Sequence, residues 1–154
     1  MSGPPVVCAT RGGEGSRAVR RRAVELAHAT ERPLVFLSVV DPSALDVPTP
    51  GGRALDAALI DELTWLARAL LRLADRRARR AGVTPELVLR AGPVREEIAR
   101  FVEERGAERL LLGAPRGTTA NVFGDDAIER FAAEVAVRSG VAVEVVRPEP
   151  REAR

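Results

Sequence analysis

The loop from Gly113 to Asp126 holds the residues of this chain whose types and spacing come nearest to a binding chemistry. Its glycines, Gly113, Gly117 and Gly124, precede a predicted helix, and a glycine-rich loop in that position can hold phosphate through backbone amides. Asp125 and Asp126 then follow, so two carboxylates stand where the phosphate would bind. Glycines also serve left-handed turns alone, and that interpretation stays open.

The two carboxylates have structural interpretations as well. Asp126 and Glu129 fit an Asp-x-x-Glu capping box at the start of a helix, which we favour over metal ligation. Asp125 is either a solvated acid of the first helical turn or a side chain that faces the ligand crevice.

Arg11 is the second candidate, because it follows an apolar run, Pro5 to Thr10, that predicts a buried strand. The carboxyl end of such a strand opens into the ligand crevice of an α/β sheet. Arg11 therefore either contacts a ligand or pairs with Asp125 or Glu14. Arg116, within the glycine loop, is a further cation for phosphate.

Residues for catalysis are few. Cys8 lies within the first predicted strand and is expected to pack as a small apolar residue, and His28, the single histidine, lies near the end of the following helix. We find no Ser-His-Asp set, no metal cluster with regular spacing and no complete Walker loop. We therefore expect no enzyme activity, no metal site and no cofactor.

The basic residues suggest a nucleic-acid binder less strongly than the pI of 9.8 implies. All 24 are Arg, the net charge is only +2, and aromatic residues make up 3% of the 154 positions. A small excess of Arg raises the pI, and few aromatics are available for base stacking. The runs Arg20 to Arg22 and Arg76 to Arg80 are predicted to be solvated helix faces, with phosphate binding as the second option.

Periodicity predicts a regular alternation of elements. Pro5 to Thr10 and Leu34 to Val40 are buried strands around a first helix with Ser16 as its N-cap, and Glu86 to Arg90 is a more polar edge strand. Two further strands are predicted at Arg109 to Leu112 and Val141 to Val146.

Helices are predicted in the segments between these strands. The helix after the long loop Asp41 to Arg53 carries leucines at alternating four- and three-residue steps, which we interpret as its inner face. Trp65 and this stripe are expected to form core or a dimer surface rather than a cofactor site. The next begins at Gly92-Pro93 and ends at Gly106, and the last ends at Gly140. Alternating strands and helices predict one α/β domain, residues 1–147, with a parallel sheet covered on both faces and a frayed tail at 148–154.

Several segments together resemble the universal stress protein family. They are the exit from the first strand at Thr10 to Ser16, the segment Leu37 to Pro42, the Gly92-Pro93 helix start, and Leu111 to Gly113 before the glycine loop. The resemblance covers nearly the whole chain. It implies a doubly wound fold similar to adenine-nucleotide alpha-hydrolases, with five parallel strands in the order 3-2-1-4-5, a dimer through the fifth strand and, in one branch, ATP between strands one and four.

The sequence departs from the ATP-binding branch at three places. Arg11 stands where that branch has Asp. Three residues separate Gly113 from Gly117 and six more precede Gly124, against spacings of two and nine in the branch. Asp125 replaces the hydroxyl residue after the last glycine. The residues that the resemblance and the strand ends offer to a ligand are Thr10, Arg11, Gly12, Val39, Val40, Gly113, Arg116, Gly117, Gly124 and Asp125.

The sequence thus predicts a universal-stress-type binding or regulatory protein, homodimeric through Val141 to Val146, that does not bind ATP in the usual way. The alternative is an ATP binder or slow ATPase that uses Arg11 and Arg116 on the phosphates and Asp125 on Mg²⁺. A single cysteine and the absence of a signal-like N-terminus favour the cytoplasm. We expect neither a membrane nor a nucleic acid as partner.

Overall fold

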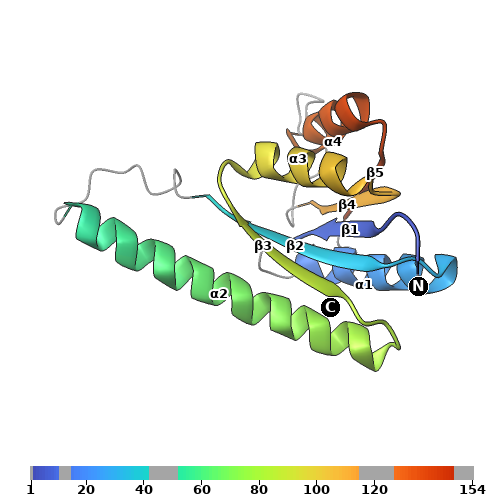
Figure 1. Cartoon of the computed structure of the whole chain (residues 1–154), viewed down its shortest axis with the longest axis horizontal. Helices are drawn as coiled ribbons and strands as arrows, with labels where there is room; N and C mark the ends of the chain where they lie inside the picture. The colour runs from blue at the N-terminus through green and yellow to red at the C-terminus, as the bar shows by residue number, and fades with distance from the viewer. Residues whose placement is uncertain (1, 11–14, 42–51, 115–126, 148–154) are drawn as a thin grey trace, which may run out of the picture.

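A computed structural model describes residues 2–10, 15–41, 52–114 and 127–147, and it contains a five-stranded sheet with the order β3-β2-β1-β4-β5 (Figure 1). Each neighbouring pair of strands is parallel, which confirms the predicted topology. The strands are β1 Val6–Ala9, β2 Leu34–Val40, β3 Glu86–Ala91, β4 Arg109–Gly113 and β5 Ala142–Val146.

Four helices cover the two faces of this sheet: α1 Gly15–Thr30, α2 Gly52–Arg80, α3 Val94–Arg105 and α4 Ala127–Ser139. Figure 1 shows α1 and α2 on one face and α3 and α4 on the other. The predicted boundaries hold within one or two residues, as is usual for helix and strand ends. One such shift concerns Ser16, which lies inside α1, because the helix begins at Gly15.

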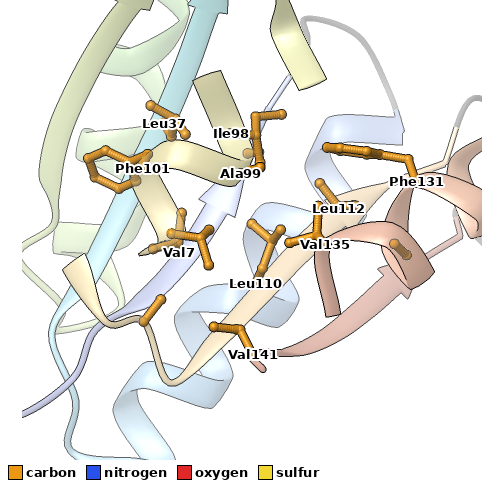
Figure 2. Close-up of a cluster of buried hydrophobic side chains, with 14 of the residues drawn as sticks. Val7, Leu37, Ile98, Ala99, Phe101, Leu110, Leu112, Phe131, Val135 and Val141 are labelled. Carbon is orange, nitrogen blue, oxygen red and sulfur yellow. The ribbon is translucent and has the colours of Figure 1, made fainter. Parts of the chain in front are cut away.

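Each face of the sheet has its own hydrophobic core. Alternate residues of β1 divide between them, with Val7 in the cluster under α3 and α4 and Cys8 in the cluster under α1 and α2. Figure 2 shows the first cluster, in which Phe101 of α3 and Val135 of α4 lie over Val7 and Leu110. Strands buried on both faces explain the continuous apolar runs of β1, β2 and β4.

The orientation of α2 contradicts one prediction. The leucine stripe was expected to be the inner face, yet Leu63, Leu66 and Leu73 are exposed, as is Trp65 at 70%. The helix instead buries Leu71, which is 5% exposed, together with Ala74 and Ala78. The N-terminal end of α2 projects past the sheet in Figure 1.

Arg20 contradicts a second prediction, because it lies on an inward-facing part of α1 and is 8% exposed. Its neighbour Arg21 is exposed, as expected, and Arg22 is half-buried and pairs with Glu144 of β5 at 3.2 Å. Arg20 is three residues before Ala23 and seven before Ala27, which are both buried, so helical geometry places all three on one side.

The start and end of α3 follow the sequence closely. Pro93 is its N-cap, and Gly106 closes it in the left-handed conformation at φ 57°. The Gly106 N–H donates to the carbonyls of Glu103 and Val102, which are among the last carbonyls of the helix.

Candidate functional site

The structure brings the ends of β1 and β4 together at the centre of the sheet. From β1 the chain adds β2 and β3 on one side of the sheet and then returns through α3 to add β4 and β5 on the other side. The strand order therefore reverses between the parallel strands β1 and β4. In open α/β sheets, ligands bind at this switch point, outside the carboxyl ends of the strands. The strand order thus confirms the predicted switch point between β1 and β4, and the ligand crevice there stays a prediction.

Thr10 and Gly113 are the described residues at the centre of this edge. Ala9 is paired with Leu112, so the residue after each of them, Thr10 and Gly113, stands at the same level of the sheet. The Thr10 N–H donates to the Leu37 carbonyl at 3.0 Å, which holds the strand end in place. Thr10 and Gly113 thus lie at the edge of the sheet where the chain leaves β1 and β4.

Val39 and Val40 extend past the end of β1, because Ala9 is paired with Leu37 of β2. Val39 packs against the cluster under α3 and α4, and Val40 is buried among the described residues. The Val40 carbonyl accepts a hydrogen bond from the Gly92 N–H at 3.0 Å. Both valines serve the core at this edge, and their contribution to ligand binding stays a prediction.

The other predicted site residues fall outside the described part of the chain. They are Arg11, Gly12, Arg116, Gly117, Gly124 and Asp125. The predicted ion pair between Arg11 and Asp125 therefore stays a prediction. Asp126 of the expected capping box also lies outside, whereas its partner Glu129 accepts a hydrogen bond from Arg147 at 3.1 Å.

Cys8 behaves as the small core residue that the sequence predicts. It is fully buried in β1, and burial raises the pKa of its thiol to about 12, although the nearby Arg20 guanidinium acts in the opposite direction. A thiol in that state is a poor nucleophile at neutral pH. His28 is exposed in the last turn of α1.

The carboxylates with shifted pKa values belong to surface ion pairs. A hydrogen bond from Arg105 lowers the pKa of Glu86, and one from Arg138 lowers the pKa of Glu96. These pairs join α3 to β3 and to α4. Among the described residues, no three His, Cys, Asp or Glu side chains form a group that could hold a metal ion. Nor does any helix in that part of the chain have the length and apolar character to cross a bilayer.

Comparison with known proteins agrees with this geometry. The model of the universal stress protein family matches residues 4–147. A universal stress protein structure from Burkholderia pseudomallei is 23% identical, with a TM-score of 0.70, and the match covers 92% of this chain and 94% of that one.

Two further solved structures have the same fold. UspA from Lactobacillus plantarum is 17% identical, with a TM-score of 0.77 and coverage of 94% and 97% of the two chains. A universal stress protein described as a complex with cAMP is 26% identical, with a TM-score of 0.63 and coverage of 93% and 96%. No curated protein matches this sequence.

Proposed function

Because this chain belongs to the universal stress protein family, we propose that it is a regulatory binding protein that does not hold ATP through the usual phosphate loop. In this proposal it acts in the cytoplasm, without enzymatic turnover and without a cofactor. Its ligand crevice lies at the ends of β1 and β4, beside Thr10 and Gly113.

The observation that carries the proposal is the residue after the last glycine of the loop. Asp125 follows Gly124 at the position where the ATP-binding branch has Ser or Thr. Asp cannot donate a hydrogen bond to phosphate when it is ionised, and it adds a negative charge. Arg11 in place of Asp and the changed glycine spacing support the same conclusion.

A comparison of two electrostatic energies favours exclusion of a triphosphate from the site. A phosphate charge about 5 Å from a carboxylate is repelled by roughly 3 kcal/mol at an effective dielectric near 20. A helix N-terminus attracts an anion by only about 0.3–1 kcal/mol. The repulsion from Asp125 therefore exceeds the attraction of the helix that follows it.

Calorimetric titration of the full chain with ATP and Mg²⁺ tests this proposal. We expect no binding in the micromolar range, and micromolar affinity or nucleotide that copurifies with the protein would overturn it. AMP and cAMP belong in the same experiment, because a relative of 26% identity is described as a cAMP complex and a monophosphate brings less charge to Asp125.

A gain-of-binding variant makes the test sharper. The double change Arg11→Asp and Asp125→Ser restores the two residue types of the ATP-binding branch. We expect it to bind ATP more tightly than the parent chain. Asp61→Ser, which removes a carboxylate from the exposed surface of α2, is the matched control and should leave ATP affinity unchanged.

A second candidate function is ATP binding with Mg²⁺ held by Asp125 and the phosphates held by Arg11 and Arg116. Carboxylates that face phosphates commonly ligate Mg²⁺, and this supports it. Under this alternative, Arg116→Ala abolishes ATP binding, and an unchanged affinity would exclude it.

We further propose a homodimer through β5. This strand is at an edge of the sheet, and an edge strand leaves backbone groups free to pair with another chain. Sedimentation of a dimer at micromolar concentration is the expected result, and a monomer at that concentration would contradict it.

A further inference from the structure

A cleft of about 510 Å³ lies between α1 and α2, on the sheet face that carries both helices. Arg17, Arg20 and Arg21 line it from α1, and Arg77 lines it from α2. Its apolar part includes Phe36 of β2. Arginines from two segments that are far apart in the sequence therefore line one cleft. This cleft is distinct from the candidate site at Thr10 and Gly113.

Small side chains account for the space between the helices. Ala74 of α2 and Ala81, which directly follows α2, also line the cleft, and each is too short to reach across to α1. The two helices make few direct contacts because each packs mainly on the sheet. Short alanine side chains in α2 and directly after it thus leave this space beside α1 open.

The lining is strongly cationic. Four guanidinium groups stand against one carboxylate, Glu25, which gives the lining a net charge of +3 at neutral pH. Within the described part of the chain, Arg17, Arg21 and Arg77 form no salt bridge. Arg20 is 8% exposed and lies at the core side of the cleft.

Several arginines on other surfaces of this protein are paired with acids. Examples from the sheet edges and the α3–α4 surface are Arg22, Arg32, Arg90, Arg100, Arg105, Arg138 and Arg147. Arg17, Arg21 and Arg77 differ from these because their like charges gather at one cleft and, among the described residues, form no salt bridge. Burial lowers the pKa of Arg20, and the positive charges of Arg77 and Arg17 lower it further. These like charges therefore make the protonated form of Arg20 less favourable.

We propose that the α1–α2 cleft binds a small organic phosphate, whose phosphate group contacts Arg17, Arg21 and Arg77 while its apolar part lies against Val24 and Phe36. Guanidinium groups present paired N–H donors that match phosphate oxygens, and a phosphate neutralises the excess charge of the cluster. The volume is in the range of small-molecule sites, and apolar lining with a few polar anchors is their usual composition.

NMR titration of the full chain with phenyl phosphate tests this site, because the probe joins one phosphate to one ring. We expect saturable shifts of the Arg17, Arg21 and Arg77 side-chain Nε–H signals and of the Val24 amide. Inorganic phosphate should shift the arginine signals with lower affinity, since it lacks the ring. Absence of saturable shifts at these residues would overturn the proposal.

Three variants separate a site from general charge attraction. Arg77→Ala should weaken phenyl phosphate binding about tenfold or more, as expected for loss of a charge-assisted hydrogen bond. Arg76→Ala removes the same charge from the neighbouring exposed position and should leave the affinity within about twofold. Glu25→Gln removes the one carboxylate and should tighten binding about threefold.

Two outcomes would contradict the proposal. If Arg76→Ala and Arg77→Ala weaken phenyl phosphate binding equally, the probe is attracted by the overall charge of α2 and is not bound in the cleft. Tighter binding of a DNA oligonucleotide, with displacement of phenyl phosphate, would assign the surface to a nucleic acid instead. Far-ultraviolet circular dichroism of each variant checks that the fold is retained, and the exposed positions of Arg76 and Arg77 make that outcome expected.

Discussion

Gly92 and Glu97 approach each other so closely that a Cβ at position 92 would force the Glu97 side chain to shift. A Cβ there would lie 2.8 Å from Glu97 Oε1, and the Gly92 backbone has a φ of 144°. Glu97 is itself buried and accepts a hydrogen bond from Arg100 at 3.2 Å. The Gly92 N–H also donates to the carbonyl of Val40, the last residue of β2, which holds the turn from β3 into α3 against that strand.

Gly92→Ala should lower the free energy of unfolding by about 1–3 kcal/mol, since it adds both backbone strain and a clash with a buried carboxylate. Urea denaturation measures the change. Gly106→Ala is the control, because its φ of 57° is also positive but a Cβ there meets nothing within 4 Å. A cost for Gly92→Ala no larger than that for Gly106→Ala would contradict the role of Glu97.

The orientation of α2 predicts a contrast between two leucines of one helix. Leu71→Ala should cost about 2–5 kcal/mol, because Leu71 is buried in the cluster with Ala74 and Ala78. Leu66→Ala should cost less than about 1 kcal/mol, because Leu66 is 49% exposed. Chemical denaturation of both variants checks the orientation, and a larger cost at Leu66 would show that the leucine stripe faces inward.

The ion pair between Arg138 of α4 and Glu96 of α3 predicts a pH dependence of stability. The pKa of Glu96 is lowered by its hydrogen bond from Arg138, so the folded state binds its proton less readily than the unfolded state. The stabilisation is complete above the unfolded pKa of about 4.3 and is lost as the pH falls through the lowered folded value.

Arg138→Ala should therefore reduce the Tm at neutral pH, and the gap to the parent chain should narrow as the pH falls below about 4. Thermal unfolding monitored from neutral to acid pH measures this. Arg79→Ala serves as the control, because Arg79 pairs with Asp75 within one helix and joins no two elements. A Tm gap for Arg138→Ala that stays constant with pH would contradict the assignment.

Cys8 should resist thiol reagents in the folded protein. It is fully buried and burial raises the pKa of its thiol, so both access and ionisation are unfavourable. Ellman's reagent at mildly alkaline pH should react slowly with the native chain and rapidly after guanidinium unfolding. Rapid reaction of the native chain would mean that β1 opens readily beside α1.

The sequence alone supplied most of the fold. Leu34 to Val40 was predicted with the bounds that β2 has, because a strand buried on both faces has a continuous apolar run. Gly106 ended α3 as predicted, because a left-handed residue at that position favours glycine. The strand order came from the family resemblance, and the site at the ends of β1 and β4 follows from that order.

Only the tertiary structure decided which faces those helices bury. In α2 the leucine spacing and the Leu71, Ala74 and Ala78 spacing are both helical, and periodicity alone cannot tell which of them meets the sheet. The burial of Arg20 and its approach to Arg77 depend on contacts between helices that are distant along the chain. Local patterns determine the elements because they act within a few residues, whereas a shared surface exists only after packing brings separate elements together.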